Sequence, residues 1–572
     1  MAQHIVVDPI TRIEGHLRIE AVLDDNNVIT EAYSAGTMFR GVELILRGRD
    51  PRDAGLLTQR ICGVCTGVHY QASIRAVENA FGVTVPKNAR LVRNLLQGSI
   101  LLRDHVVHFY QLHALDWVDL LSALQADPKK AAAVAREYSD DPWNSGESQY
   151  RAVQAKLGNF AKSGSLGIFG NAYWGHPAYR LTPEENLVAV SHYLDALTVQ
   201  RNTGKMAAIF GAKDPHSQST VVGGVTCVQD IENPERLGLF GSLLAETSRF
   251  IETAYLPDVL MVGKAYAPEA AAGVGAGLRS YMCYGGYELD DTPLFGAKTL
   301  FPKGLVLGGD LSTVHPFDQQ KVAEDVTHSW YEGNATLHPY QGVTEPHYTG
   351  LNRENGVAYL KTDEKYSWLK SPLYDDDRVE VGPLARMIVG YVSGDANIRA
   401  HVDDVLTTAG FPIDALFSSV GRTAARMIET RIVAEAMKGW LAELQANVAG
   451  GDVQTWTPFD FRKVSADAEG HGLWEANRGS LGHWVRIKDG KIVNYQAVVP
   501  TTWNASPRDG KGRVGAYEAA LKGVRLAQPD QPLEILRTVH SFDPCLACAV
   551  HVVDARGREI GTYQLQPSGG GR

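Results

Sequence analysis

Hydrophobic residues recur three or four positions apart along four stretches of the chain, the spacing that places them on one face of a helix. In the second stretch, Thr182-Pro-Glu-Glu185 forms a capping box with proline at the first helical position. The first stretch stops short of Pro128 and the third before Pro257, because proline interrupts a helix. At 1.5 Å per residue the first helix would be about 50 Å long. The pattern predicts helices over residues 88–125, 182–210, 233–256 and 413–446.

Other segments alternate at every second residue, which is typical of strands. Residues 4–34 alternate around a turn at Asp24-Asp-Asn-Asn27, and residues 482–495 predict a hairpin that turns at Asp489-Gly490. Residues 258–381 are rich in Gly, Pro, Tyr and Asp, so we expect loops and short strands there. Together these elements predict a mainly α (α+β) fold, with a bundle of long helices at its core and small β-sheets or hairpins at its periphery.

Composition is that of an ordinary globular protein. Of the 572 residues 44% are hydrophobic and 21% charged, and 65 acidic against 55 basic residues give a net charge of −10. That balance argues against a nucleic-acid-binding surface. No apolar run reaches the eighteen or so residues of a membrane span, and the N-terminus does not resemble a secretory signal. Taken alone, the chain is expected in the cytoplasm unless a partner that carries a signal exports it.

Four of the six cysteines form two pairs near opposite ends of the chain. Arg60-Ile-Cys62-Gly-Val-Cys65-Thr-Gly-Val-His69 and Asp543-Pro-Cys545-Leu-Ala-Cys548-Ala-Val-His551 each hold a C-x-x-C followed by a histidine, whereas Cys227 and Cys283 stand alone and are expected to be buried. The two pairs would make one S4 metal site if the fold closes on them. A structural zinc ion and an iron–sulfur cluster both suit four thiolates. A thioredoxin-like redox pair is less favoured, because neither motif follows a βα pattern.

The two cysteine motifs resemble the signatures of the large subunit of nickel–iron hydrogenases, and the closest likeness is to respiratory, membrane-associated uptake enzymes. The resemblance extends over essentially the whole chain. Six further segments carry it, in order: Arg12-Ile-Glu14-Gly-His16, Gly36-Thr-Met-Phe-Arg-Gly-Val-Glu43, His108-Phe-Tyr-Gln-Leu-His-Ala-Leu-Asp-Trp117, His328-Ser-Trp-Tyr331, Val381-Gly-Pro383 and Val498-Val-Pro-Thr-Thr-Trp-Asn504.

The resemblance implies a nickel ion held by all four thiolates and an iron that carries carbon monoxide and two cyanides. By position, Cys62 and Cys545 would bind nickel alone, while Cys65 and Cys548 would bridge to the iron. Soft thiolates select such a thiophilic transition metal and leave it an open coordination position. The implied reaction is the reversible heterolytic cleavage of H2 into protons and electrons.

Four more residues have roles in proton transfer and around the open site by the same resemblance. Glu14 matches the proton-transfer carboxylate, although on the sequence alone a solvated strand position suits it better. Arg478 would lie over the open site, and Asp543 and Asp104 would fix its guanidinium. Asp543 is otherwise simply a turn residue before proline. Cys545 is a reasonable first proton acceptor.

A magnesium ion is implied behind the two metals, bound by Glu43, the backbone carbonyl of Ala497 and His551. Thr501 would hydrogen-bond a cyanide. His69 would be a hydrogen-bonding partner of a cysteine sulfur, and the alternative for it is a satisfied helix histidine. Each of these assignments comes from the resemblance and not from the spacing of the residues.

Two features depart from the family pattern. Asn477 precedes Arg478 where the family usually has proline, and an asparagine adds hydrogen-bond donors there. The chain also continues for 21 residues beyond His551, as residues 552–572. In the family a protease removes such a tail after nickel insertion, so we expect residues 1–551 to form one interwoven catalytic unit. The alternative is a small structural hairpin around Arg556-Gly557.

The cysteines assigned to the metals leave none for an electron relay, so an iron–sulfur small subunit is implied as partner in a heterodimer or a dimer of heterodimers. The resemblance further implies a membrane cytochrome or quinone-linked subunit, a maturation endopeptidase and nickel-insertion proteins. Export with the small subunit would place the enzyme on the periplasmic side of the cell membrane. Two alternatives stay open: a cytosolic uptake or H2-sensing hydrogenase, and a structural thiolate–zinc scaffold without turnover.

Overall fold

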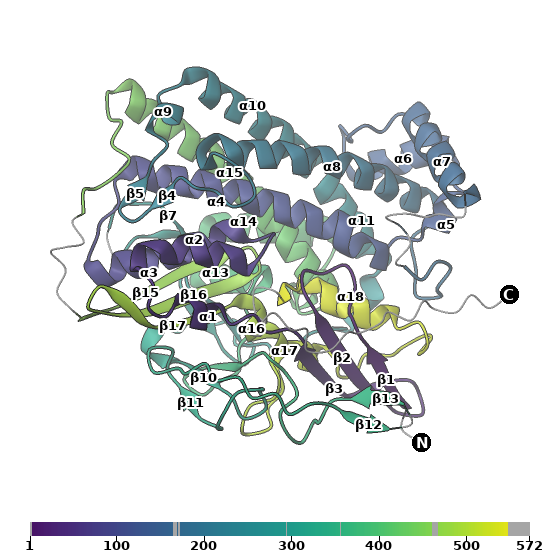
Figure 1. The fold of residues 1–572 in the computed structure, drawn as a ribbon. Coiled ribbons are helices and arrows are strands. Elements are labelled where there is room, and N and C mark those ends of the chain that lie inside the picture. Colours follow the sequence, from purple (N-terminus) through teal and green to yellow (C-terminus); the bar gives the residue numbers. More distant parts are fainter. Residues whose placement is uncertain are drawn as a thin grey trace.

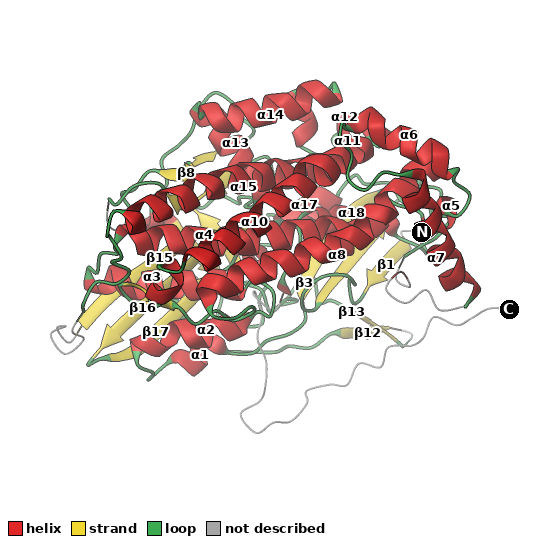
Figure 2. Cartoon of the chain, turned by 90° about the horizontal axis from the view of Figure 1, so that it is seen from above, coloured by secondary structure: helices red, strands yellow, loops and turns green. Residues whose placement is uncertain are grey.

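The computed structural model describes residues 3–163, 169, 172–292, 295–354, 356–459 and 467–546. Long helices run across one side of the molecule and most strands gather on the other (Figure 1). Seen from above, the helices cover the strands (Figure 2). The predicted α+β fold with a long-helix core is therefore confirmed.

Four helices longer than sixteen residues form the core of the helical side. Helix α4 lies between α8 and α15, and every residue of α4 from Asn88 to Val106 is buried. Such a helix is enclosed on all sides and does not present one face to solvent. The four are α4 (Lys87–Val107), α8 (Pro183–Gly211), α10 (Pro234–Phe250) and α15 (Ser419–Ala449).

The shorter helices surround this core or connect it to the sheets. They are α1 (Val42–Leu46), α2 (Ala54–Thr58), α3 (Thr66–Phe81), α5 (Leu120–Ala123), α6 (Pro128–Tyr138), α7 (Glu147–Lys162), α9 (Val228–Ile231), α11 (Leu256–Ala265), α12 (Ala267–Ala271), α13 (Pro383–Ser393), α14 (Ala396–Ala409), α16 (Pro500–Ala505), α17 (Ala516–Leu521) and α18 (Leu533–Ser541).

The strands form small antiparallel sheets. Three sheets have three strands: β1 (Gln3–Val7), β2 (Leu17–Leu23) and β3 (Ile29–Gly36); β11 (Thr336–Leu337), β10 (Val322–Asp325) and β14 (Ser371–Tyr374); β15 (Asp467–Ala476), β16 (Gly479–Lys488) and β17 (Lys491–Val498). The two-stranded pairs are β4 (Thr220–Val221) with β5 (Gly224–Val225), β6 (Tyr281–Cys283) with β9 (Gly304–Val306), β7 (Gly286–Glu288) with β8 (Thr299–Phe301), and β12 (Asn352–Glu354) with β13 (Val357–Tyr359).

Helix α3 lies directly on strand β15. A Cβ added to Gly472 would come within 1.8 Å of the Ala72 carbonyl oxygen, and one added to Gly470 within 2.2 Å of the Ala76 carbonyl oxygen. Only glycine allows the two backbones to approach so closely. This contact fixes the hairpin β15–β16 against the helix that begins at Cys65.

The predicted single helix over residues 88–125 is wrong in its second half. Helix α4 ends at Val107, which gives it a length of about 32 Å. A π-helical turn follows at His108–His113 and a 3-10 turn at Ala114–Asp116, before α5 restarts behind the N-cap Asp119. The hydrophobic spacing does not reveal the extra residue that a π turn inserts.

The helix predicted to end before Pro257 continues through it. After α10 a π-helical turn at Ile251–Tyr255 leads into α11, where Pro257 occupies the first turn. Proline is tolerated there because the preceding π turn interrupts the regular i→i−4 hydrogen bonds, which proline cannot continue. Tyr110 and Tyr255, one from each π turn, have ring centroids 5.9 Å apart, so the two irregular turns face each other.

Most other predictions hold. The capping box at Thr182 and Glu185 is present, the N-terminal sheet forms, and the hairpin turns at Asp489-Gly490. The last long helix begins at Ser419, a few residues later than predicted, and residues 258–381 hold α11 and α12 as well as short strands. Cys227 and Cys283 are buried, as predicted.

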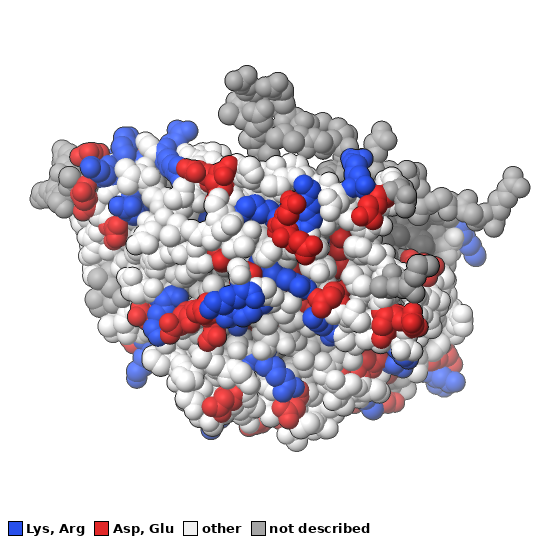
Figure 3. Space-filling model, turned by 90° about the horizontal axis from the view of Figure 1, so that it is seen from below, with Lys and Arg blue, Asp and Glu red and all other residues white. Residues whose placement is uncertain are grey.

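The described residues contain no helix with the length and apolar character of a membrane span. On the face seen in Figure 3, basic and acidic side chains are intermixed and do not gather by sign. The N-terminal sheet lies beside α17 and α18, so segments from the two ends of the chain are neighbours (Figure 1).

Candidate metal centre

The N-terminal cysteines flank the start of α3. Cys62 follows a 3-10 turn at Gln59–Ile61, and Cys65 is the N-cap of the helix. The backbone N–H groups of Val64 and Cys65 both donate to Cys62 Sγ at 3.2 Å. A helix N-terminus and converging N–H groups favour negative charge, so this turn stabilises a thiolate. Both cysteines are buried.

The C-terminal motif reaches the site through a tight turn after α18. Asp543 has φ 58°, a left-handed conformation, and Cys545 pairs with Glu14 of the N-terminal segment in a short parallel bridge. Leu546 N–H donates to the Glu14 carbonyl at 2.7 Å. Thr501 Oγ1, at the start of α16, accepts from Cys545 N–H at 3.1 Å. Segments from both ends of the chain and from α16 therefore fix this cysteine.

The two cysteine motifs meet. Cys545 Sγ lies 3.4 Å from Cys62 Sγ and 3.6 Å from Cys65 Sγ, and the three sulfurs are close enough to hold one metal ion. All three side chains are buried. The predicted closure of the fold on residues from opposite ends is thus found for three of the four cysteines. Cys548 and His551 lie outside the described residues.

Glu14 reaches the same sulfur. Its Oε2 lies 3.3 Å from Cys545 Sγ, at hydrogen-bond distance for a sulfur donor. The Glu14 backbone is fixed at both ends of the residue, by the N–H of Leu546 and by the carbonyl of Pro544, which accepts from Glu14 N–H at 3.3 Å. The carboxylate is therefore positioned to exchange a proton with the thiolate.

Arg478 lies at the tip of hairpin β15–β16. Its Nη2 donates to Asp543 Oδ1 and its Nε to the Asp543 carbonyl, both at 3.0 Å, while Nη1 is 3.4 Å from Asp104 Oδ2. Burial alone would lower the pKa of Arg478, but Asp543, Cys545 and Asp104 raise this pKa well above its usual value. The guanidinium is thus a fixed positive charge beside the sulfurs.

A small cavity lies between Arg478 and the sulfurs of Cys65 and Cys545. Val68, Leu481 and Pro500 give it apolar walls, and Arg478 and Thr501 add hydrogen-bond donors. A mostly apolar pocket with a few polar groups suits small ligands bound to a metal on the sulfurs.

His69 lines the same cavity and pairs with another histidine. Its Nδ1 lies 3.1 Å from His483 Nε2, and His483 Nδ1 is 2.7 Å from the Tyr495 hydroxyl. Burial lowers the pKa of His69 to about 4, and Cys62 opposes this shift only in part. His69 is therefore neutral at pH 7.

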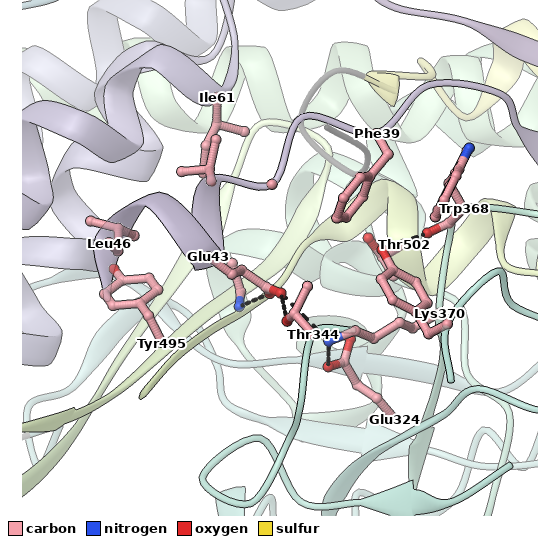
Figure 4. Close-up of a pocket in the computed structure, with 14 residues that line it drawn as sticks. Phe39, Glu43, Leu46, Ile61, Glu324, Thr344, Trp368, Lys370, Tyr495 and Thr502 are labelled. Atoms are coloured by element: carbon pink, nitrogen blue, oxygen red, sulfur yellow. Dashed lines mark hydrogen bonds and ion pairs between the residues drawn. The ribbon is translucent and has the colours of Figure 1, made fainter. Parts of the chain in front are cut away.

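Glu43, predicted as a magnesium ligand, lines a second cavity (Figure 4). Its Oε1 accepts from the N–H of Ala497 at 2.9 Å, and its Oε2 accepts from the Thr344 hydroxyl. The Lys370 ammonium lies 2.9 Å from Glu324 and 3.7 Å from Glu43. Two carboxylates against one ammonium leave net negative charge, which favours a further cation.

Asp116 at the end of the broken helix was not singled out as a site residue. Its Oδ2 is 2.8 Å from His113 Nδ1 and 2.6 Å from His540 Nδ1, and Arg12 donates to its Oδ1 at 2.5 Å. His540 Nε2 lies 2.8 Å from the Thr11 carbonyl. The cluster therefore fixes the two residues that precede Ile13 and Glu14. The signal was the unusual number of Asp and His residues on a predicted core helix.

Fold and site together define a large subunit that gathers thiolates from its two ends into a buried metal-binding pocket. A family model described as nickel-dependent hydrogenase matches residues 40–551, and one described as HoxL-like matches residues 4–35. The chain belongs to the nickel-dependent hydrogenase family, as a large subunit, and is an oxidoreductase.

Curated relatives match nearly end to end. The quinone-reactive Ni/Fe-hydrogenase large chain of Wolinella succinogenes is 47% identical, covering 99% of both chains. The uptake hydrogenase large subunit of Rhizobium leguminosarum bv. viciae is 46% identical over 99% of this chain and 98% of its own. Hydrogenase-1 large chain of Escherichia coli is 44% identical over 99% and 97%.

Solved structures agree with the fold. The Ni-Fe-Se hydrogenase of D. vulgaris Hildenborough superposes with a TM-score of 0.76 at 35% identity, covering 96% of this chain and 100% of that one. The [NiFeSe]-hydrogenase of Dm. baculatum gives a TM-score of 0.75 at 32% identity with the same coverage.

Proposed function

We propose that this chain is the catalytic subunit of an uptake hydrogenase, which cleaves H2 reversibly and heterolytically and passes the electrons to an iron–sulfur small subunit. The observation that carries the proposal is the convergence of Cys62, Cys65 and Cys545, with Glu14 at 3.3 Å from the Cys545 sulfur. The names of the relatives, large chains and uptake or quinone-reactive enzymes, support it.

The residues present fit a nickel–iron group. Three buried sulfurs within bonding reach of one ion are soft ligands, and the adjoining cavity has donors suited to carbon monoxide and cyanides on the iron. Cys62 and Cys545 would hold nickel alone, and Cys65 would bridge with Cys548. Thr501 would donate to a cyanide, with His69 beside the sulfurs. When bound, the group supplies an open coordination position at which H2 is polarised.

The protein's own part in the reaction begins with the proton. Cys545 Sγ accepts it next to the site and Glu14 Oε2, 3.3 Å away, takes it on. A thiolate and a carboxylate at this distance transfer a proton without rearrangement. Groups that carry the proton from Glu14 to solvent act after this transfer.

Arg478 acts by charge and shape. Its guanidinium, fixed by Asp543 and Asp104, stabilises the buried thiolates and limits what else enters the cavity.

We further propose that Glu43, the Ala497 carbonyl and His551 bind magnesium in the second cavity. The net negative charge of that cavity supports this assignment.

We propose that residues 1–551 form one catalytic unit and that residues 552–572 are removed during maturation by an endopeptidase, after nickel-insertion proteins have acted. Electrons would pass from the small subunit to a membrane cytochrome or quinone-linked subunit, on the periplasmic side of the membrane. The quinone-reactive name of one relative supports that acceptor. A cytosolic uptake or H2-sensing enzyme is the alternative, and a signal peptide on the small subunit would separate the two.

Metal analysis with infrared spectroscopy tests the function. The purified heterodimer should contain nickel and iron in equal amounts and show bands of metal-bound carbon monoxide and cyanide. One equivalent of zinc without nickel would instead establish a structural scaffold.

Mass spectrometry of the active large subunit tests its maturation. We expect a C-terminus at His551. An active chain that ends at Arg572 would refute the cleavage.

A further inference from the structure

Asn477 lies at the tip of hairpin β15–β16, next to Arg478. Ala476 pairs with Gly479, so Asn477 and Arg478 form the two-residue turn. A Cβ at Gly479 would lie 2.6 Å from Val381 Cγ2, which shows that the tip is pressed against the residues before α13. Asn477 is only 1% exposed. An amide at that depth requires hydrogen-bond partners.

The side chain and the main chain of Asn477 are fixed separately. Its Nδ2 donates to Asp104 Oδ2 at 2.6 Å, and its carbonyl accepts from Arg386 Nη2 at 3.0 Å. Arg386 is held in turn between Glu429 and Glu475, and all three side chains are fully buried. Arg386 of α13 therefore fixes the main chain of Asn477, and the side-chain amide binds Asp104 on α4.

Asn477 and Arg478 approach the same carboxylate oxygen. The amide lies 2.6 Å from Asp104 Oδ2, whereas Arg478 Nη1 is 3.4 Å away, beyond a strong hydrogen bond. The two close contacts of Arg478 are both on Asp543, at 3.0 Å. The guanidinium therefore rests on the turn that carries Cys545. A proline in place of Asn477 would have no side-chain donor.

We propose that Asn477 is a positioning residue: by occupying Asp104 it holds the Arg478 guanidinium on the Asp543 side of the site, over the sulfurs. Without the amide, Asp104 accepts Arg478 more closely and draws the guanidinium toward α4, away from Cys545. This inference rests on the proposed metal centre beneath Arg478. The bond at issue joins Asn477 to Asp104, 373 positions apart, and exists because asparagine stands where the family usually has proline.

Asn477→Ala and Asn477→Pro test the inference in the heterodimer loaded with both metals. Both variants remove the donor, so we expect the infrared bands of carbon monoxide and cyanide to shift. We also expect kcat/KM for H2 to fall about tenfold, the scale of one hydrogen bond to a charged group. The exchange Asn477→Asp with Asp104→Asn restores a bond with its donor and acceptor reversed, and should return the bands toward those of the unchanged protein.

Ser99→Ala is the matched control. Ser99 lies on α4, the helix of Asp104, is buried and donates to the Leu95 carbonyl at 2.8 Å, so its hydroxyl takes no part in the bonds of Asp104 or Arg478. Its loss should leave the bands in place. Unshifted bands in fully loaded Asn477→Ala or Asn477→Pro protein overturn the inference, and the proline variant decides if the alanine variant does not fold. Absence of these bands from the unchanged protein would instead refute the proposed function.

Discussion

Two residues beside the thiolates adopt left-handed backbone conformations although neither is glycine. Arg12 has φ 54° and Asp543 has φ 58°. Such conformations cost of order 1 kcal/mol each and persist where surrounding contacts fix them. Asp116 binds the Arg12 side chain, and Arg478 binds Asp543. The turns that deliver Glu14 and Cys545 are therefore determined by side-chain contacts and not by local backbone preference.

Glu14→Gln should abolish proton exchange while both metals remain bound. Glutamine keeps the shape of the side chain but cannot accept the proton from Cys545 Sγ at 3.3 Å, and loss of such a group costs about 10² to 10⁴ in rate. The measurement is isotope exchange between D2 and water, normalised to nickel content. Glu31→Gln on strand β3, in the sheet next to the Glu14 segment in sequence, is the control and should exchange normally. Full exchange by Glu14→Gln protein would remove Glu14 from the path.

Arg478→Lys should lower kcat/KM about a hundredfold, because lysine replaces a planar fork with a single point charge and loses one or both contacts with Asp543. Steady-state H2 oxidation at saturating acceptor measures the effect. Exposed Arg399, which donates to the Tyr391 carbonyl and lies over the Tyr391 ring, provides the matched Arg399→Lys control. Equal activity of the two variants would show that the guanidinium does not act at the site.

At the scale of elements, the sequence predicted a helix start or a turn correctly where contacts within a few residues specify it. The capping box at Thr182 and the turn at Asp489-Gly490 both formed, since each is specified within a few residues. The π turns were missed because tertiary contacts stabilise them: the Tyr110 hydroxyl donates to Asp258 Oδ2 at 2.7 Å, which joins the two irregular helices. Hydrophobic spacing contains no information on that contact.

The sequence also identified most residues of the site, but not all of the contacts between them. The cysteine motifs and the residues carried by the resemblance pointed to the pocket, and the structure brings Glu14, Arg478, Asp543 and Asp104 to it. The bonds from Asp116 to His540 and from Asn477 to Asp104 could not be foreseen, because each joins residues hundreds of positions apart that only the folded chain makes neighbours.

Asp116→Asn should loosen the N-terminal segment and slow proton exchange. The NH2 group of the amide would oppose either the two imidazole nitrogens on the Oδ2 side or the guanidinium of Arg12 on the Oδ1 side. In both orientations Arg12 loses its charge partner, and breaking a buried pair costs about 3–5 kcal/mol. Both the melting temperature and the isotope exchange of nickel-loaded protein should fall.

Asp258→Asn separates the two effects. Asp258 is equally buried and pairs with His192 at 2.8 Å, but on α11, without contact to Thr11 or Arg12. It should lose stability and keep its exchange rate per nickel. If both variants exchange at the same rate, Asp116 does not position Glu14.

At the scale of the whole molecule, the fold is closed by contacts between its two ends. Arg537 of α18 donates to the Asp116 carbonyl at 2.8 Å, Arg426 of α15 to the Ser541 carbonyl at 3.0 Å, and Val28 pairs with Arg525. These contacts involve no metal-binding residue. The chain therefore has contacts of its own, apart from the metal-binding residues, that hold these segments together around the site.

Glu518 on α17 makes this closure dependent on pH. It is fully buried, and its Oε1 accepts from Ser34 N–H at 3.0 Å and from the Tyr366 hydroxyl at 2.9 Å. Burial raises the pKa of Glu518 to about 7, and the contacts with Ser34, Tyr366 and Arg508 only partly oppose it. The folded state thus binds a proton more tightly than the unfolded chain does.

The consequence is a loss of stability as pH rises from about 4.5 to about 7, worth roughly 3 kcal/mol. Glu518→Gln keeps the acceptor and has no charge to bury, so its melting temperature should match that of the unchanged protein near pH 4.5 and exceed it above pH 7. Glu31→Gln should instead melt below the unchanged protein throughout this range, with the difference closing only below about pH 4.5, because Lys522 and Arg508 outweigh burial and lower the pKa of Glu31. Parallel melting curves across this pH range for Glu518→Gln and the unchanged protein would show that Glu518 is ionised in the folded state.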